Sequence, residues 1–310
     1  MRQTGYRMYL FIDEYDNFAN NVLMGGHVKS RQRYPSELDA SSEDLLKTVL
    51  STVKFATSGL GLDRIFLTGV SPVVMSDVTS GHNISEDISL EPDFHDLCGF
   101  WESEIEDVLQ QLVRSCSFSE EAIASGLQMM RLFYNGYSFS VDKPTNELVY
   151  NPTLALYFLK HYQRHCRPPH NMLDDNLAMD HTKLTYISRR SNGERLIQDA
   201  LQEKQPVTIK RLATRFGIAE ILATQQRSSF LASLLYYFGI LTLAGRDKRA
   251  KLILRIPNLV VRRLYVEHLA NLLLPPLEQD AGQLAAETLC SICCTRILHV
   301  HKCMYKIFRK

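Results

Sequence analysis

Two adjacent carboxylates, Asp13 and Glu14, directly follow the apolar residues 9–12 and are the best catalytic candidates in the sequence. Apolar runs of this kind are typical of strands in α/β sheets that helices cover on both faces. Such sheets bind their ligands at the carboxyl ends of the strands, where these two acids stand. There, one carboxylate can hold Mg²⁺ through water and its neighbour can polarise an attacking water molecule. The alternative is an exposed acidic strand end with no catalytic role.

The elements around this pair predict a parallel sheet. Residues 9–12 form the first expected strand and residues 64–68 the next, and a serine-capped helix with one apolar face is expected between them. Strand, helix and strand in this order predict a right-handed crossover between parallel strands. We therefore expect Asp13 and Glu14 to lie with Ser71 at the carboxyl ends of adjacent parallel strands.

Short motifs follow one another along the chain in a characteristic order. They are residues 11–18, 64–73, 80–84, 97–100, 133–139, 150–152, 237–242 and 256–258. In number and order this series resembles the AAA-ATPase-like family of bacterial and archaeal proteins, over residues 8–275. The resemblance implies a P-loop NTPase that uses ATP and Mg²⁺. Members of the family often continue into a nuclease-like domain of the PD-(D/E)XK type.

The resemblance also implies roles for the strand-end residues. Asp13 and Glu14 would be the Walker B pair, Asp13 holding Mg²⁺ through water and Glu14 polarising the water that attacks the γ-phosphate. Thr68 and Ser71 would place a hydroxyl near that phosphate, as the polar sensor residue of AAA-type enzymes does. The alternative is that Thr68 only begins a turn. An arginine finger is implied as well, and its candidates are indistinguishable in the sequence: Arg131, Arg189, Arg190, Arg262 and Arg263.

The phosphate-binding loop of the family, G-x-x-x-x-G-K-[ST], does not occur in these 310 residues, because no glycine is followed by lysine. That loop must precede the Walker B strand, and only twelve residues precede Asp13. The resemblance therefore implies a truncated ATPase that lacks both its Walker A segment and the nuclease-like domain. We expect these residues alone to be inactive towards ATP, so the sequence leaves open whether the chain acts as an enzyme. We also expect the sheet to expose an apolar face that the missing segment would cover.

The motif Tyr134-Asn135-Gly136-Tyr137 resembles a family signature that more often reads Tyr-Asp-Gly-Tyr. Gly136 is expected to supply a positive φ in a tight turn, with the tyrosines packed over it. We interpret the motif as structural, and contact with a substrate is the alternative. Asn135 replaces the acid of the signature, so a role that needs a carboxylate is in doubt.

The end of the chain is rich in residue types that bind metals, but we expect no metal site there. These residues are Cys290, Cys293, Cys294, His299, His301 and Cys303. Structural zinc sites normally take two ligand pairs from opposed elements that are separated by a longer gap. Here the ligand types lie on one continuous apolar and basic stretch, so we interpret residues 276–310 as a divergent tail.

The predicted fold class is α/β and then mostly α. Residues 1–92 would be the C-terminal half of a P-loop NTPase parallel sheet, a partial AAA-ATPase-like core with Walker B. Residues 93–205 have a helical period, and residues 206–275 are expected to form a winged-helix-like lid. Within this lid, residues 207–216 and 228–238 are expected to be helices, and residues 241–243 and 252–254 are expected to be strands.

The composition is that of a globular protein without a membrane span. Hydrophobic residues make up 45% and charged residues 22%, and no apolar run approaches the ~20 residues that a span needs. The net charge of +1 gives no global attraction to nucleic acid or to a membrane. Seven cysteines, an odd number, do not resemble a disulfide framework, so we expect a reducing, cytoplasmic location.

Three hypotheses remain open from the sequence. The chain is a truncated AAA-type ATPase, a non-enzymatic module that contacts protein or nucleic acid, or a gene remnant with no activity. Basic residues in the winged-helix-like part would favour the second hypothesis: Lys210, Arg211, Arg215, Arg246, Lys248, Arg249 and Lys251.

Overall fold

The chain folds into two compact units. Unit 1 comprises Met1–Asp87, Tyr186–Glu194 and Arg211–Phe238, and unit 2 comprises Ile88–Thr185, Arg195–Lys210 and Gly239–Lys310. The computed structural model describes residues 6–16, 48–49, 51–53, 55–57, 61–70, 72, 86–116, 120–142, 147–173, 181–202, 206–214, 216 and 226–273. Ser71 and the tail residues 276–310 therefore lie outside the described residues.

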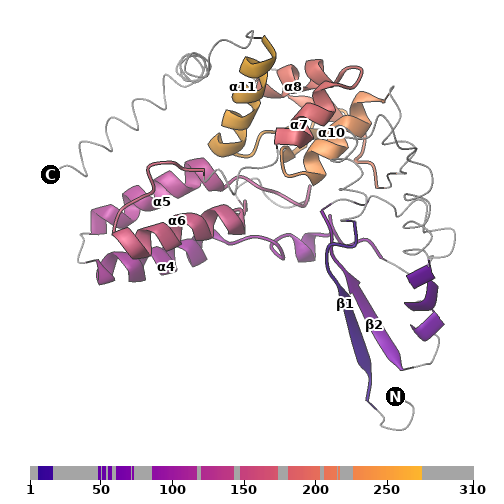
Figure 1. The fold of residues 1–310 in the computed structure, drawn as a ribbon, viewed down its shortest axis with the longest axis horizontal. Coiled ribbons are helices and arrows are strands. Elements are labelled where there is room, and N and C mark those ends of the chain that lie inside the picture. Colours follow the sequence, from indigo (N-terminus) through magenta and orange to yellow (C-terminus); the bar gives the residue numbers. More distant parts are fainter. Residues whose placement is uncertain are drawn as a thin grey trace, which may run out of the picture. The chain divides into compact units, whose positions relative to one another are not determined.

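Unit 1 contains a parallel pair of strands, β1 (Met8–Ile12) and β2 (Leu62–Leu67), which run side by side in Figure 1. Between them, residues 48–49, 51–53 and 55–57 are helical. The register pairs Ile12 with Leu67, so both strands end at the same edge of the sheet. Parallel pairing is what the order strand, helix, strand predicts.

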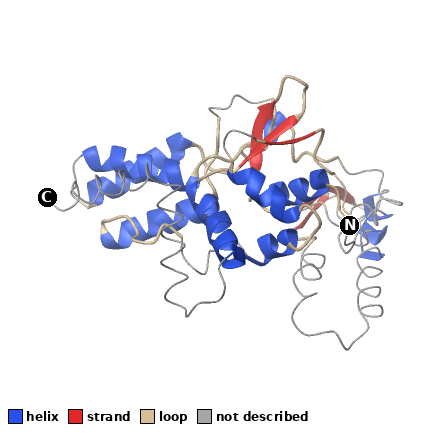
Figure 2. Ribbon diagram, turned by 90° about the horizontal axis from the view of Figure 1, so that it is seen from above, coloured by secondary structure: helices blue, strands red, loops and turns tan. Residues whose placement is uncertain are grey.

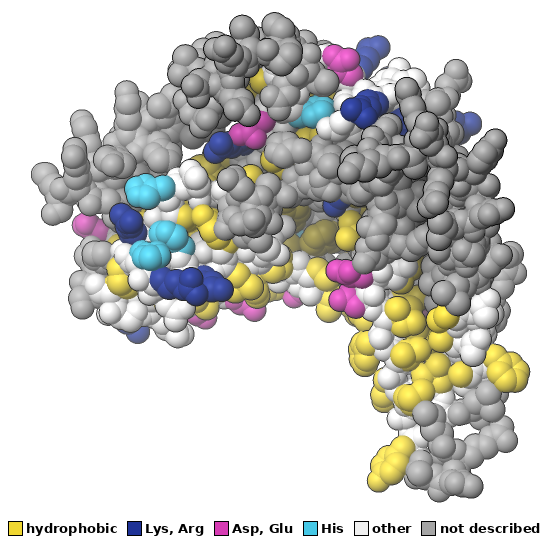
Figure 3. All heavy atoms as spheres, in the orientation of Figure 1, with side chains coloured by type: hydrophobic (Ala, Val, Ile, Leu, Met, Phe, Trp, Pro, Cys, Tyr) yellow, Lys and Arg dark blue, Asp and Glu magenta, His cyan; other side chains and the backbone are white. Residues whose placement is uncertain are grey.

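β1 is largely exposed, so the expectation of a strand buried on both faces is wrong. The side chains of Tyr9 and Phe11 are 54% and 75% exposed, and Leu10 and Ile12 are half-buried. Because side chains alternate along a strand, Tyr9 and Phe11 share one face. Figure 3 shows apolar side chains gathered over these two strands. Among the described residues no third strand joins this sheet, and the expected exposed apolar face is confirmed.

The remaining described part of unit 1 is built around α10 (Ser228–Tyr237). The Phe216 ring is fully buried and packs edge-on against two rings of this helix, Phe230 at 4.9 Å and Tyr237 at 5.6 Å between centroids. Two further helices, α7 (His181–Ser188) and α8 (Gly193–Leu201), each span a boundary between the units.

Unit 2 begins with the 3-10 turn η1 (Pro92–Phe94) and is built on three helices, α4 (Glu102–Ser115), α5 (Glu120–Tyr134) and α6 (Pro152–His165). These helices lie together in Figure 1. In α4, the buried residues Ile105, Leu109 and Val113 recur every four positions and form the stripe that faces the core. The same core contains these further buried side chains: Met130, Tyr134, Tyr150, Leu154, Phe158 and Tyr162.

The ends of α6 show how the sequence delimits a helix. Asn151 caps the start, where its side-chain oxygen accepts a hydrogen bond from the backbone N–H of Leu154 at 3.1 Å, and Pro152 occupies the first turn. Cys166 ends the helix with a left-handed backbone, φ 49°. Its sulfur forms a disulfide with Cys116, the residue that ends α4. The odd number of cysteines predicted no disulfide framework, so this bond was not expected from the sequence.

Unit 2 also contains a three-stranded antiparallel sheet in the order β3-β5-β4, whose strands are drawn in red in Figure 2. The strands are β3 (Val207–Ile209), β4 (Thr242–Arg246) and β5 (Leu252–Arg255), and α11 (Leu259–Leu273) follows. The helix predicted over residues 207–216 is wrong at its start, because β3 pairs with β5 there. Val207 and Ile209 are buried and Thr208 is exposed, which is the alternation of a strand.

Candidate functional site

Asp13 and Thr68, which follow the ends of β1 and β2, are joined by a hydrogen bond. The Thr68 hydroxyl donates to Oδ1 of Asp13, and the backbone N–H of Glu14 donates to the same oxygen at 2.9 Å. Backbone hydrogen bonds continue past the strands, from Thr68 N–H to the Ile12 carbonyl at 2.9 Å and from Tyr15 N–H to the Thr68 carbonyl at 3.1 Å. The carboxylate and the hydroxyl therefore lie at the same carboxyl edge of two parallel strands.

Within the described residues, only one oxygen of the Asp13 carboxylate accepts hydrogen bonds. Asp13 is exposed, and among the described residues none donates a hydrogen bond to its Oδ2. A carboxylate oxygen beside a hydroxyl is a hard, oxygen-only donor set, which suits Mg²⁺. Within the described part of the chain, no three His, Cys, Asp or Glu side chains gather to hold a metal. A magnesium ion at Asp13 would therefore take most of its ligands from water and phosphate oxygens.

Glu14, the second member of the pair, has a left-handed backbone conformation with φ 51°. For a residue with a side chain, this conformation costs about 1–2 kcal/mol relative to the right-handed region. Residues in such conformations concentrate at functional sites, where the surrounding structure fixes them. Here the Glu14 N–H bond to Asp13 is part of that surrounding structure.

A second contact lies behind this edge, between Asp16 and the loop after β2, and was not predicted from the sequence. Asp16 is 1% exposed, and its Oδ1 accepts a hydrogen bond from the backbone N–H of Val70 at 3.1 Å. A Cβ atom on Gly69 would lie 2.5 Å from that oxygen and 2.7 Å from the Tyr15 ring, so only glycine fits. Both Asp16 and Gly69 stand in the motifs that suggested the family, which was the available signal.

Tyr15 is held neutral beside this contact. Burial, together with the neighbouring charges of Asp16 and Asp87, raises the pKa of the Tyr15 phenol well above its usual range. A tyrosine is already protonated at physiological pH, so this shift extends the neutral range of the phenol to more alkaline pH, and the hydroxyl can act as a hydrogen-bond donor. Its ring also forms part of the wall against which Gly69 packs.

The motif at residues 134–137 forms a tight turn in unit 2. Gly136 has the expected positive φ, 110°, and a Cβ atom there would overlap the Pro257 carbonyl. Its N–H donates to the Asn135 side-chain oxygen at 2.6 Å, and the Asn258 side chain donates to the Asn135 carbonyl at 3.1 Å. Tyr134 is fully buried, and its hydroxyl donates to the Met172 carbonyl at 2.8 Å.

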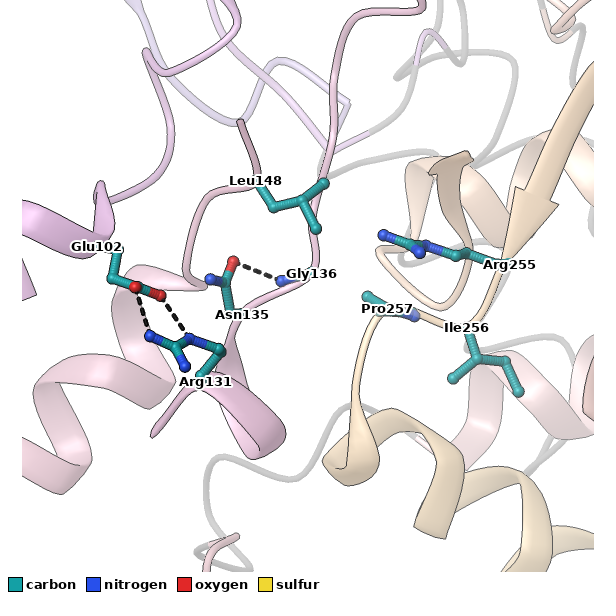
Figure 4. Close-up of a pocket in the computed structure, with 8 residues that line it drawn as sticks. All are labelled: Glu102, Arg131, Asn135, Gly136, Leu148, Arg255, Ile256 and Pro257. Atoms are coloured by element: carbon teal, nitrogen blue, oxygen red, sulfur yellow. Dashed lines mark hydrogen bonds and ion pairs between the residues drawn. The ribbon is translucent and has the colours of Figure 1, made fainter. Parts of the chain in front are cut away.

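A pocket of about 390 Å³ lies beside this turn (Figure 4). Arg131 donates two hydrogen bonds to Glu102, at 2.8 and 2.6 Å, and the Tyr150 hydroxyl donates to the same carboxylate at 3.1 Å. The bonds from Arg131 lower the pKa of Glu102, and the carboxylate in turn raises the pKa of Arg131. Figure 4 shows Arg255 on the opposite side of the pocket from this pair. The complete lining is Glu102, Arg131, Asn135, Gly136, Leu148, Arg255, Ile256 and Pro257.

The arginine-finger candidates now differ in their surroundings. Arg131 is paired with Glu102, and Arg263 with Glu267 at 2.6 Å. In unit 1, the Arg190 guanidinium lies 4.3 Å from the centre of the Tyr186 ring. Arg189 is exposed, and Arg262 also makes contacts. These surroundings do not single out any of the five arginines as the arginine finger.

Comparison with known proteins finds similarity in the N-terminal part of the chain. The family model described as "Predicted AAA-ATPase" matches residues 1–79, which contain Asp13, Glu14 and Thr68. A curated relative, the "uncharacterized protein in vnfD 5'region" of Azotobacter chroococcum mcd 1, is 28% identical over 158 residues, which is 50% of this chain. The match spans only 25% of that relative's length.

Two further comparisons concern the structure. No solved structure matches the chain. Among the described residues, no helix is both long and apolar enough to cross a membrane. The family match covers the segment in which the sequence motifs first indicated this relationship, so residues 1–79 are similar to the AAA-ATPase-like family.

Proposed function

We propose that Asp13 and Glu14 are the Walker B pair of an AAA-type nucleotide site that binds and hydrolyses ATP with Mg²⁺. The observation that carries this proposal is the hydrogen bond from Thr68 to Asp13. It joins a carboxylate and a hydroxyl at the carboxyl edge of two parallel strands, where α/β sheets bind their ligands. The family match over residues 1–79 supports the same assignment.

In this proposal each side chain has a distinct role. Thr68 and the Glu14 N–H fix one oxygen of Asp13, so that the other oxygen can hold a water ligand of Mg²⁺. Bound Mg²⁺ would neutralise charge on the phosphates. Glu14 would orient and polarise the attacking water. Ser71, outside the described residues, is proposed as a further sensor-like hydroxyl with Thr68.

These residues hold only part of such a site. P-loop amides and the P-loop lysine make most contacts to the β- and γ-phosphates, and no G-x-x-x-x-G-K-[ST] occurs in the 310 residues. Asp13 and Glu14 alone present two negative charges to a polyanion. We therefore propose that the 310 residues by themselves neither bind ATP tightly nor hydrolyse it.

The exposed face of β1 supports the idea that further structure completes the sheet. Sheets of parallel strands occur almost only with both faces covered. Tyr9 and Phe11 remain exposed on β1, and this apolar face matches what a P-loop segment would cover. On the same proposal, residues 1–92 are the partial core, residues 93–205 a helical region and residues 206–275 a winged-helix-like lid. We propose a cytoplasmic location, where ATP and Mg²⁺ are abundant and where the Cys116–Cys166 pair would be reduced.

The test measures Mg·ATP binding by calorimetry and phosphate release, with the 310-residue chain and with a version that carries a family P-loop segment upstream of β1. We expect neither binding nor turnover from the chain alone, and turnover once the P-loop is supplied. In the completed protein, Glu14→Gln should abolish hydrolysis and spare binding, because it removes the charge that polarises the water. Glu86→Gln, an exposed glutamate of the same unit, is the matched control.

Two results would contradict the proposal. Turnover by the 310-residue chain that Glu14→Gln abolishes would mean that another basic group replaces the P-loop. Unchanged hydrolysis in the Glu14→Gln variant of the completed protein would remove the Walker B assignment itself.

A further inference from the structure

Five cations gather at one end of the three-stranded sheet in unit 2. One of them ends β4, three occupy the turn between β4 and β5, and the fifth, Lys210, directly follows β3. Because Ile209 pairs with Leu252 in antiparallel register, Lys210 lies opposite Lys251 on the neighbouring strand. We call this group the basic tip; its members are Lys210, Arg246, Lys248, Arg249 and Lys251.

The turn that carries the basic tip is fixed by its own hydrogen bonds. The Asp247 carboxylate accepts from the backbone N–H groups of Arg249 and Lys251, both at 2.8 Å. Asp247 and Lys251 are also joined through their backbones at 2.8 Å, and the Ala250 N–H donates to the Asp247 carbonyl at 3.0 Å. Gly245, with φ 100°, permits the sharp change of direction. A ligand of the tip therefore meets a preorganised backbone.

The positive charge of the basic tip is not neutralised locally. Asp247 is the only acid between residues 244 and 251, and the backbone already uses its carboxylate. Among the described residues, no Asp or Glu forms an ion pair with any of the five cations. Lys210, Arg246, Lys248 and Arg249 are exposed, and Lys251 is half-buried. The net charge of the whole chain is only +1, so this local concentration of positive charge is not visible in the overall composition.

The basic tip combines lysine and arginine with no aromatic and no large apolar side chain, which limits the kind of polyanion that it can bind. Residues 244–251 contain no aromatic side chain, so they offer no stacking surface to the bases of a single strand. They also contain no large apolar side chain that could insert into a lipid bilayer. Lysine and arginine without such partners are suited to contacts with phosphate oxygens, which carry no sequence information.

We propose that the basic tip binds the sugar–phosphate backbone of a nucleic-acid duplex, without sequence preference. This inference goes beyond the proposed nucleotide site and needs no ATP. Each cation that contacts a phosphate releases condensed counterions, so the affinity must fall steeply with salt concentration. The double variant Lys248→Ala/Arg249→Ala removes two such contacts and leaves Asp247, which holds the turn, in place.

The experiment follows the fluorescence anisotropy of a labelled DNA duplex of about 25 base pairs, at several salt concentrations. For Lys248→Ala/Arg249→Ala we expect a salt slope shallower by about 1.8 and an affinity lower on the order of 50-fold at 0.1 M salt. Lys160→Ala/Arg164→Ala, on the exposed face of α6, changes the net charge equally and should bind as the parent does. An RNA duplex of the same sequence, used as competitor, tells which duplex is preferred. Thermal unfolding checks that each variant is folded.

Several outcomes would overturn the proposal. Equal losses in the two double variants would show that only the net charge matters. A single strand that competes better than either duplex would require a stacking surface that the tip lacks. Binding to anionic lipid vesicles with the same loss in Lys248→Ala/Arg249→Ala, and none to duplexes, would identify a membrane surface instead.

Discussion

The carboxylate of Asp16 accepts a hydrogen bond from the backbone N–H of Val70 across a sequence separation of 54 residues. This bond ties the segment after β1 to the segment after β2, directly behind the edge where Asp13 meets Thr68. The buried Asp16 is thus a positioning residue, because it fixes the two loops that carry the residues of the candidate site.

Gly69→Ala should destabilise the protein, because the new Cβ would meet the buried Asp16 carboxylate and the Tyr15 ring. We expect a loss of about 1–3 kcal/mol in the free energy of unfolding, measured by urea denaturation. The comparison is Gly126→Ala in α5, where the nearest atom is the end of the Leu109 side chain and alanine favours the helix. Equal effects of the two substitutions would contradict the close packing at Gly69.

Glu102→Gln should lower stability in a pH-dependent way. Arg131 lowers the pKa of Glu102 in the folded state, so the pair stabilises the protein above the ordinary carboxyl pKa of 4.5 and loses this effect as the pH falls through the lowered pKa. Because both side chains are more than a third exposed, at 38% and 52%, the effect is about 0.5–1 kcal/mol.

The measurement for this pair is urea unfolding of the parent and of Glu102→Gln at pH 7 and at pH 3. The difference between them should be present at pH 7 and absent at pH 3. Asp107→Asn, an exposed acid on the same helix, is the control and should show no such difference. If the difference in unfolding free energy between the parent and Glu102→Gln persists at pH 3, the effect comes from packing of the side chain and not from its charge.

Reduction of the Cys116–Cys166 disulfide should cost about 4 kcal/mol of unfolding free energy, since the bond closes a loop with a sequence separation of 50. Urea unfolding with and without a reductant measures this cost, and Cys166→Ser should reproduce it. Cys98, an exposed free thiol, provides the control Cys98→Ser, which should have no effect. A stability that does not respond to the reductant would mean that the two cysteines are unpaired in solution.

Phe11→Ser should reduce self-association of the 310-residue chain. The Phe11 side chain is 75% exposed on the apolar face of β1, so its replacement removes contact area between copies and little internal packing. Sedimentation velocity measures the change. Leu156→Ser on α6 removes an apolar side chain that is 53% exposed and lies outside that face. If this control acts as strongly as Phe11→Ser, association does not depend on β1.

The sequence predicted those elements whose signal is local and long enough to show a period. The helical period expected over residues 93–205 agrees with α4, whose buried stripe is Ile105, Leu109 and Val113. Two apolar runs separated by a helix predicted the parallel pair β1 and β2. β3 was missed because three residues show no clear period, and its partner β5 lies some 45 residues later.

For the site, the rule that ligand residues follow parallel strands predicts Asp13, Glu14 and Ser71 at one edge. Asp13 meets Thr68 at that edge, and Ser71 lies outside the described residues. The Asp16–Val70 bond was missed because a buried carboxylate and an exposed one look alike in a sequence. The Cys116–Cys166 bond depends on where α4 and α6 end relative to each other, which only the folded chain determines.

The left-handed backbone of Glu14 changes how substitutions at this position must be interpreted. Glycine or asparagine there would relax the main chain and would also remove the Glu14 carboxylate, so that a gain in stability could mask a loss of catalysis. A β-branched residue would disturb the turn and lower activity for conformational reasons alone. Only glutamine keeps length, shape and backbone preference while removing the charge. A library that varies position 14 freely would therefore measure two properties at once, and selection for stability would favour variants that have lost the acid.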